Sequence, residues 1–169
     1  MANLLILGAG GYGRTVAEAV AGQFDEICFL DDGQTAPEVL GPCADYLAFA
    51  GRFDYAYPAF GSNDLRGTWL QKLTEAGYRL PRIIHPQAFV SPSAVVEEGA
   101  AVLALAGVGS RTVVRRGAVV NMGALVDHDC TVSFCVHLAP GAVVKAGNLL
   151  APMTKVEAGQ VVERAPYSF

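Results

Sequence analysis

The residues with the clearest chemical potential lie in Val126-Asp127-His128-Asp129-Cys130, where one histidine stands between two aspartates. A neutral imidazole can take a proton from an amine or a hydroxyl near pH 7, and a flanking carboxylate fixes its tautomer and raises its basicity. His128 is therefore a candidate general base, with Asp129 supporting it. The alternative is a solvated histidine in a turn, and the repeat described below favours the catalytic interpretation.

A second group of residues has the spacing of a phosphate-binding loop. Gly8-Ala9-Gly10-Gly11-Tyr12-Gly13 follows a short apolar stretch and opens a predicted helix. Glycines let the backbone approach a diphosphate, and the start of a helix favours negative charge. Asp31 ends the next predicted strand, where a carboxylate could bind a ribose hydroxyl. NAD would fit this pattern, but the region looks too short for a full dinucleotide fold, so a nucleotide-sugar diphosphate fits better. A tight turn without a ligand is the other alternative.

The second half of the chain repeats every six residues. An aliphatic residue recurs at each sixth position from Ile84 to Val162, and a small residue follows most of them four positions later. Such hexapeptide repeats predict a left-handed parallel β-helix, in which three hexads form one triangular coil. We expect the repeated aliphatic residues to fill the interior and the small residues to fit its corners. His128 is third in its hexad, so it should project outward.

The histidines and cysteines after position 127 look at first like metal ligands. Their spacing is His128-x-Cys130-x4-Cys135-x-His137. The repeat argues against a metal site, because consecutive hexads face different sides of the prism and Cys130 should point inward. We expect no metal, and we expect His85 to be a packing residue where the repeat begins.

The first part of the chain alternates predicted strands and helices. Strands are expected at 4–7, 26–30 and 55–60, and helices from the glycine loop to residue 21 and over 64–76. Residues 34–52 contain several breakers and are expected to be loop with one helical turn. The sequence therefore predicts an α/β domain at 1–81, small and Rossmann-like, and a β-helix domain at 82–169, whose last residues would cover its open end.

Composition excludes several classes of function. The net charge is −4, and lysine and arginine do not cluster, so neither nucleic acid nor a membrane surface is an expected partner. The four cysteines have no framework spacing, and the N-terminus has no basic region before its first strand. A cytoplasmic location is the expectation.

These motifs together resemble the bacterial nucleotide-sugar acetyltransferases of surface-glycan pathways, a group that includes sialic acid O-acetyltransferase-like proteins. The resemblance runs from about Leu4 to Gly147 and resumes in the last coil. It is carried by the glycine loop, the histidine segment and three further segments, namely Phe29-Leu30-Asp31-Asp32, Phe60-Gly61-Ser62-Asn63-Asp64-Leu65-Arg66 and Ile84-His85-Pro86.

The resemblance implies a homotrimer that transfers acetyl from acetyl-CoA directly to a UDP-4-amino-4,6-dideoxy sugar, without a metal or a covalent enzyme intermediate. His128 would be the general base, and Asp129 would raise its basicity. Acetyl-CoA would lie in the groove between neighbouring prisms. The implied binding residues are Gly10, Gly11, Tyr12, Asp31, Asp32 and Gly61 for the nucleotide sugar, and His137 and, from the register, Ala158 for acetyl-CoA.

The sequence departs from the family pattern in two places. The family commonly has histidine where this chain has Tyr12, and the predicted prism is about one coil shorter than in other members. Two alternative functions stay open at this point. One is O-acetylation of a sialic acid or related sugar, and the other is a nucleotide-sugar-binding module that has lost catalysis.

Overall fold

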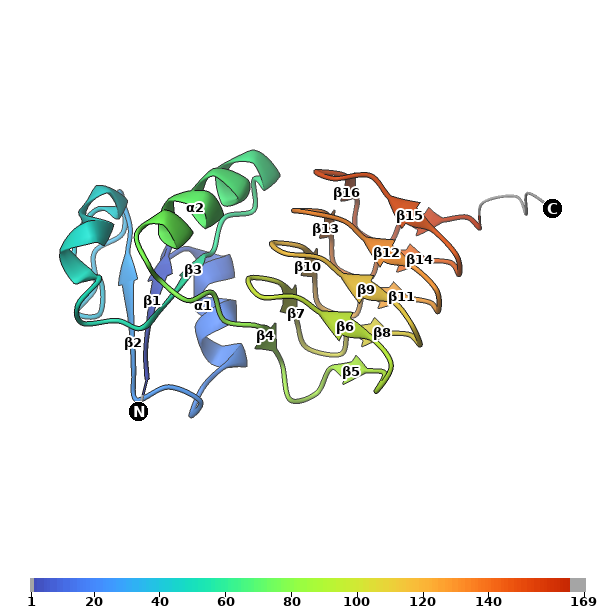
Figure 1. Ribbon diagram of the computed structural model, residues 1–169, viewed down its shortest axis with the longest axis horizontal. Coiled ribbons are helices and arrows are strands. Elements are labelled where there is room, and N and C mark those ends of the chain that lie inside the picture. The colour runs from blue at the N-terminus through green and yellow to red at the C-terminus, as the bar shows by residue number, and fades with distance from the viewer. Residues whose placement is uncertain (1, 165–169) are drawn as a thin grey trace. The chain divides into compact units, whose positions relative to one another are not determined.

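The computed structural model describes residues 2–164, and the chain divides into two compact units at the Pro81–Arg82 peptide bond (Figure 1). The segment 165–169, which we expect to cover the end of the prism, lies outside the described residues. Within the described part, no helix has the length and apolar content needed to cross a membrane.

The described N-terminal unit is built on a three-stranded parallel sheet with the strand order β2-β1-β3. The central strand β1 (Asn3–Leu7) lies between β2 (Glu26–Leu30) and β3 (Tyr55–Pro58). Residues 4–7 of β1 are completely buried, as expected for a central strand covered on both faces. Because the strands are parallel, their carboxyl ends meet at one edge, where ligands bind in sheets of this kind.

Two α-helices and one 3-10 helix complete this unit. Helix α1 (Gly11–Ala19) follows β1, and helix α2 (Asn63–Glu75) follows β3. The Ser62 side chain caps α2 by accepting a hydrogen bond from the backbone N–H three residues later, at 3.3 Å. The segment 34–52, expected to be mostly loop, contains the 3-10 helix η1 (Cys43–Phe49). The third strand ends two residues earlier than the sequence predicts, at Pro58.

The C-terminal unit is a parallel β-helix whose described part contains one two-residue strand for each of the fourteen hexads. Strands 18 residues apart pair with one another, as Val113 does with Thr131, and so form three sheets. We call them the first face (β4, β7, β10, β13, β16), the second face (β5, β8, β11, β14, β17) and the third face (β6, β9, β12, β15). The strand bounds are Ile83–Ile84, Phe89–Val90, Val95–Val96, Ala101–Val102, Gly107–Val108, Val113–Val114, Val119–Val120, Leu125–Val126, Thr131–Val132, His137–Leu138, Val143–Val144, Leu149–Leu150, Lys155–Val156 and Val161–Val162 for β4 to β17.

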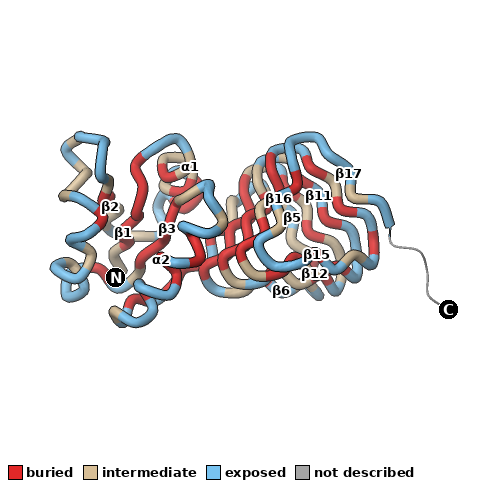
Figure 2. The backbone as a smooth tube through the Cα atoms, turned by 90° about the horizontal axis from the view of Figure 1, so that it is seen from above, coloured by how far each residue is buried: buried red, intermediate tan, exposed pale blue. Residues whose placement is uncertain are grey.

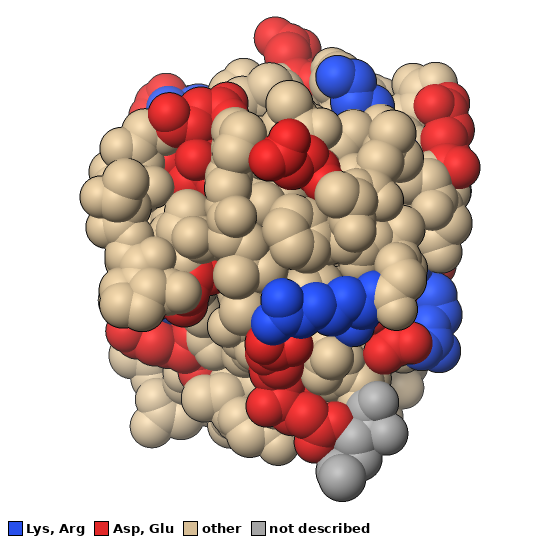
Figure 3. Space-filling view, turned by 90° about the vertical axis from the view of Figure 1, so that its left-hand side faces the viewer, with Lys and Arg blue, Asp and Glu red and all other residues tan. Residues whose placement is uncertain are grey.

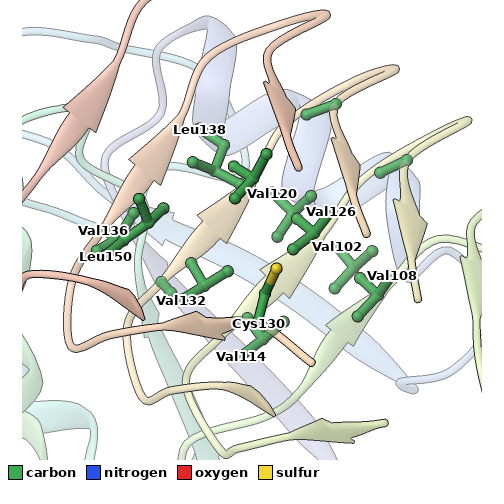
Figure 4. Close-up of a cluster of buried hydrophobic side chains, with 14 of the residues drawn as sticks. Val102, Val108, Val114, Val120, Val126, Cys130, Val132, Val136, Leu138 and Leu150 are labelled. Carbon is green, nitrogen blue, oxygen red and sulfur yellow. The ribbon is translucent and has the colours of Figure 1, made fainter. Parts of the chain in front are cut away.

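The repeated aliphatic residues form the interior of this prism, as predicted. Val102, Val108, Val114 and Val120 are completely buried, and the small residues at the fifth positions join the same cluster (Figure 4). Buried segments accordingly recur in every coil (Figure 2). Apolar burial on this regular pattern is the main source of the prism's stability.

The corners of the prism adopt a backbone conformation that the sequence pattern did not reveal. In each hexad that begins at positions 96 to 156, the fourth residue has a positive φ. Glycine occupies six of these corners, and the other five strain an L-residue backbone at a typical cost of about 1 kcal/mol each. The five are Leu105, Arg111, Asp129, Cys135 and Met153.

Charged side chains form local pairs on the surface. In the N-terminal unit Arg52 pairs with Glu26, and Arg79 lies 3.8 Å from Asp54. On the face of the molecule shown in Figure 3, basic side chains lie beside acidic ones rather than forming a patch of their own. Such exposed pairs contribute little to stability.

The interior of the prism is open to a simple test with Val120→Ala in β10. The substitution removes two methyl groups from a completely buried site, so we expect a loss of about 2 kcal/mol in the free energy of unfolding. Urea unfolding followed by far-UV circular dichroism measures it. Val161→Ala in β17, where the side chain is exposed, should cost less than about 0.5 kcal/mol. Equal losses from the two variants would contradict the interior role of Val120.

Candidate active site

His128 lies at the corner between the second and third faces, in the turn from β11 to β12. Its Nδ1 is 2.6 Å from Oδ2 of Asp129, and its side chain is 46% exposed. An ionised carboxylate only accepts hydrogen bonds, so Nδ1 carries the proton and donates it. Nε2 of the neutral ring is then a proton acceptor. It lies 3.9 Å from Oδ1 of Asp127, which is beyond hydrogen-bond distance.

Asp129 is held by a second partner that the sequence pattern did not suggest. Arg111 donates from Nε to Oδ1 at 2.6 Å and from Nη2 to Oδ2 at 2.8 Å. The bonds from Arg111, and to a smaller extent the bond from His128, hold the pKa of the Asp129 carboxyl far below its usual range. The only signal in the sequence is the distance of 18 residues between Arg111 and Asp129, which stacks them in consecutive coils.

The corner is fixed from inside the prism by Thr112. Its side-chain Oγ1 donates to the carbonyl of Asp127 at 2.6 Å and accepts from the backbone N–H of Cys130 at 3.1 Å. Gly109 lies next to the same turn, and a Cβ there would come within 2.8 Å of the backbone of Asp127 and His128. The backbone on both sides of His128 is therefore held by residues of the preceding coil.

Cys130 points into the prism, among the aliphatic side chains (Figure 4). It is 1% exposed, and burial raises the pKa of its thiol. His128 points the other way, so the metal-like string in the sequence does not converge. Among residues 2–164, no group of three histidine, cysteine, aspartate or glutamate side chains is arranged to hold a metal ion.

His85 has a local role in the first coil. Its Nδ1 accepts a hydrogen bond from the backbone N–H of Gln87 at 3.0 Å, and its side chain is only partly buried. This contact shapes the turn after β4, and the packing role expected of His85 stays a prediction.

His137 and Ala158 lie away from the His128 corner. His137 is on β13 of the first face, with Nε2 3.3 Å from Nδ2 of Asn121, and it is half-buried. Ala158 is exposed in the turn after β16 of the same face. In a triangular prism, the first face lies opposite the corner that carries His128. A single prism therefore does not bring these two residues to His128.

A shallow apolar groove runs along the second face and reaches the His128 corner. It has a volume of about 350 Å³ and is lined by Phe89, Gly107, Leu125 and Val143, with Asp127 and Lys145 at the corner. Phe89 is 64% exposed and Leu125 49%. Residues of four successive coils make this groove, and we did not predict it from the sequence.

The glycines of the N-terminal loop divide into two kinds. A Cβ on Gly13 would lie 1.9 Å from the carbonyl oxygen of Gly8, so packing of α1 against β1 requires glycine there. Gly8 itself has a φ of +99°. A Cβ on Gly10 or Gly11 would meet nothing within 4 Å. These two glycines are not needed for packing, which favours close approach of a ligand over a simple tight turn.

Asp31 and Asp32 are both bonded to the backbone. Asp31 accepts from the N–H groups of Ala9 (2.7 Å), Gly33 (2.8 Å) and Gln34 (2.7 Å). Burial opposes ionisation of Asp31, but these three bonds and the nearby Arg14 charge outweigh it and lower its pKa. Asp32 accepts from the backbone N–H of Cys43 at 2.8 Å. Asp31 thus ties the glycine loop to the loop after β2.

A pocket of about 340 Å³ lies in the loop after β2. Residues 31–36 and 39–42 line it, so both aspartates border it. It lies after β2, at the edge of the sheet where the strands have their carboxyl ends. Its position is that expected for part of a ligand bound across this edge.

Tyr12 directs its hydroxyl into the N-terminal unit. The Tyr12 and Tyr57 hydroxyl oxygens are 2.7 Å apart, and Tyr57 is completely buried. Burial raises the pKa of Tyr12 to about 12. The hydroxyl is therefore engaged within the protein, and the part of Tyr12 that faces the open end of α1 is its backbone N–H.

Gly61 lies in the turn between β3 and α2. A buried arginine side chain forms hydrogen bonds to this turn. Arg66 is completely buried and donates to the carbonyl of Phe60 at 2.9 Å and to Oδ1 of Asn63 at 2.8 Å. A Cβ on Gly61 would meet nothing within 4 Å. Like Gly10 and Gly11, it leaves open space at the edge of the sheet.

Comparison with known proteins relates the whole chain to sugar acetyltransferases. Residues 3–73 match the PglD N-terminal domain. The acetyltransferase domain of PglB from Neisseria gonorrhoeae FA1090, solved with acetyl coenzyme A, is 35% identical, with 94% of this chain and 80% of that chain covered and a TM-score of 0.88. PerB from Caulobacter crescentus, solved with CoA and GDP-perosamine, is 28% identical, with coverages of 97% and 90% and a TM-score of 0.86. WeeI from Acinetobacter baumannii AYE, at 19% identity, shares the fold, with coverages of 94% and 87% and a TM-score of 0.63.

A small Rossmann-like unit followed by a left-handed parallel β-helix, with an exposed histidine–carboxylate pair at a corner, defines an acyltransferase of the hexapeptide-repeat class. The fold class expected from the sequence is thereby confirmed. The chain belongs to the bacterial nucleotide-sugar acetyltransferase family.

The role of Thr112 can be tested with Thr112→Val, which keeps the shape of the side chain and removes its hydroxyl. The Asp127 carbonyl and the Cys130 N–H would each lose a partner, so the free energy of unfolding should fall by about 1–3 kcal/mol. Circular dichroism during urea unfolding measures it. The matched control is Thr131→Val on the outward side of β12, which should cost less than about 0.5 kcal/mol. A similar loss in both variants would show that the Thr112 hydroxyl does not hold the corner.

The role of Asp31 predicts a pH dependence. Its pKa is lowered in the folded state, so its contribution to stability is complete above about pH 4 and is lost as the pH falls through the folded pKa. Asp31→Asn should lower the free energy of unfolding by about 1–3 kcal/mol at pH 7, and the difference from wild type should narrow below pH 4. Fluorescence of Trp69, the single tryptophan, reports unfolding of this unit. Asp25→Asn, at an exposed position, is the control, and a difference that stays constant with pH would count against the prediction.

Proposed function

We propose that the protein is an acetyl-CoA-dependent N-acetyltransferase that acts on a UDP-4-amino-4,6-dideoxy sugar. The observation that carries the proposal is the 2.6 Å contact between Nδ1 of His128 and Asp129, which leaves Nε2 as an exposed base. The relatedness of the whole chain to proteins solved with acetyl coenzyme A, or with CoA and GDP-perosamine, supports the acetyl donor and a nucleotide-linked sugar acceptor.

In the proposed reaction, the sugar amine attacks the carbonyl carbon of the thioester and forms the new C–N bond. Nε2 of His128 accepts the proton that the amine nitrogen loses, and Asp129 stabilises the resulting imidazolium through Nδ1. The C–S bond then breaks, and the CoA thiolate leaves and takes the proton back from Nε2. Atoms and charges balance without a metal or a covalent enzyme intermediate.

The backbone of the chain supplies the remaining polar contacts in this proposal. Negative charge develops on the carbonyl oxygen of the thioester during attack, and a backbone N–H near the groove would stabilise it.

We further propose that the active enzyme is a homotrimer in which acetyl-CoA lies between neighbouring prisms. A single prism keeps His137 and Ala158 away from His128, so the three act together only across an interface between copies. Large exposed apolar side chains flank the His128 corner on both sides, as expected of a surface that another copy covers. They are Phe89 and Leu125 on the second face and Val95 and Leu149 on the third.

The nucleotide sugar would bind at the carboxyl edge of the N-terminal sheet. The backbone of Gly10, Gly11 and Tyr12 at the start of α1 suits a diphosphate. The pocket beside Asp31 and Asp32 would take the base and ribose, and Gly61 would close the site. With Asp31 already bonded to three backbone N–H groups, contact to the ligand here would come from its remaining lone pair or from the loop backbone.

The proposal is tested by CoA release from purified protein given acetyl-CoA and a panel of acceptors, namely UDP- and GDP-linked 4-amino-4,6-dideoxy sugars and a sialic acid. We expect release with a UDP-linked amino sugar. Release with GDP-linked sugars alone would correct the nucleotide, and release with a sialic acid alone would favour O-acetylation. No release with any acceptor, in protein shown to be trimeric, would overturn the proposal.

His128→Ala should lower kcat by about two to four orders of magnitude, because it removes the proton acceptor. His85→Ala is the matched control, since the His85 side chain bonds to the backbone N–H of Gln87 in its own turn of the first coil, and it should leave kcat unchanged. Unchanged turnover in His128→Ala would remove His128 from the role of base.

A further inference from the structure

Arg111 shares the carboxylate that supports the proposed base. Oδ2 of Asp129 accepts from Nη2 of Arg111 at 2.8 Å and from Nδ1 of His128 at 2.6 Å, while Oδ1 accepts from Nε of Arg111 at 2.6 Å. We propose that Arg111 is a positioning residue that orients the His128 ring through Asp129 and offsets the negative charge of that carboxylate beside the ring. Its effect on catalysis rests on the proposed function above.

The orientation follows from the geometry of the fork. A guanidinium that holds both carboxylate oxygens fixes the plane of the carboxylate, which a single bond from histidine would leave free to turn. Both backbones are also anchored. The Arg111 N–H donates to Oγ of Ser93 at 3.1 Å, and the Asp129 N–H donates to the carbonyl of Ser110 at 2.9 Å. Oδ2 is therefore presented to Nδ1 in one direction, and Nε2 faces outward.

The corner backbone contributes to the same arrangement. Arg111 and Asp129 occupy the fourth positions of hexads in consecutive coils, with φ values of +56° and +58°. Glycine is the residue that tolerates this conformation best, and it occupies the next corner of the column, Gly147. Arg111 and Asp129 thus occupy two stacked corners at which a glycine backbone would be less strained.

The charge of Arg111 acts on the proton affinity of the ring. An isolated aspartate would stabilise the imidazolium and keep the ring protonated to higher pH, and the guanidinium offsets that charge. The other charged groups at the corner are Asp127, 3.9 Å from Nε2, and Lys145, which lines the groove and pairs with Glu163. The Cys130 thiol faces inward. Removing Arg111 removes a nearby positive charge and frees the Asp129 charge, and both changes favour the protonated ring.

Arg115 provides a matched control for this arrangement. It pairs with Glu97 across the same spacing of 18 residues, with Nη1 2.6 Å from Oε1. Arg115 directly follows β9. Among the residues that the structure describes, the Glu97 carboxylate bonds to groups of Arg115 and Arg116 and to no histidine. Arg115→Gln thus removes an ion pair between coils without touching the His128 corner.

The first measurement does not depend on activity. The Cε1 proton of His128 is followed by NMR against pH in wild type, Arg111→Gln, Arg111→Lys and Arg115→Gln, with the resonance assigned by its loss in His128→Gln. We expect the midpoint of the His128 titration curve to rise by about half a pH unit in Arg111→Gln. It should return close to the wild-type value in Arg111→Lys and be unchanged in Arg115→Gln. A midpoint that is the same in Arg111→Gln and wild type, at equal thermal stability, would overturn the proposal.

The second measurement is the pH profile of kcat for the same variants. In Arg111→Gln, the acidic limb of the kcat profile should move to higher pH, and the plateau value of kcat should fall about tenfold. Arg111→Lys should restore the limb but not the plateau, because one ammonium does not hold both carboxylate oxygens. If Arg111 has only a structural role, Arg111→Gln and Arg115→Gln will have the same limb and plateau. If wild type transfers no acetyl group but the NMR midpoint shifts as expected, the proposed function fails and the assignment of Arg111 to the ring stands.

Discussion

The hydrogen bonds between successive coils are the constraint on which the C-terminal unit depends. Along each face, backbone N–H groups of one coil donate to carbonyl groups of the next, as Val113 does to Cys130 at 2.9 Å and Arg115 to Val132 at 2.8 Å. This ladder places every residue beside the one 18 positions away. It keeps the repeated valines in the interior, repeats the positive φ at the corners, and brings Arg111 and Thr112 to the turn that carries His128.

The regular parts of the fold could be predicted because they depend on one residue type at each position. The six-residue period correctly predicted a strand in each hexad and the inward direction of Cys130. The contacts of the candidate site could not be predicted in the same way. Arg111 and Gly109 act on a turn one coil away, and their effect depends on corner geometry that glycine occupies in some coils and a charged residue in others. The groove on the second face likewise combines residues of four coils, none of which is unusual in its own hexad.

The N-terminal unit shows a different limit to what the sequence alone can predict. The glycine pattern predicted a ligand loop, and the structure separates Gly8 and Gly13, which the packing requires, from Gly10 and Gly11, which it does not. The pattern also suggested a carboxylate for a ribose hydroxyl. In the structure Asp31 bonds to the backbone of two loops, so much of its acceptor capacity is used within the protein. Residue type and position alone do not distinguish a carboxylate that shapes a site from one that binds in it.

The spacing of 18 residues also determines how such a chain can change its length. The contacts that hold the His128 corner come from three successive coils. Arg111 and Thr112 bond to it from the preceding coil, and the backbone N–H of Gly147 in the following coil donates to the His128 carbonyl at 3.1 Å. Duplication or deletion of a whole coil further along preserves every inward residue and leaves this corner untouched. Insertion of a single residue instead would turn the following aliphatic side chains out of the interior. The prism is therefore free to vary in units of one coil over evolution, while its chemistry stays with one corner.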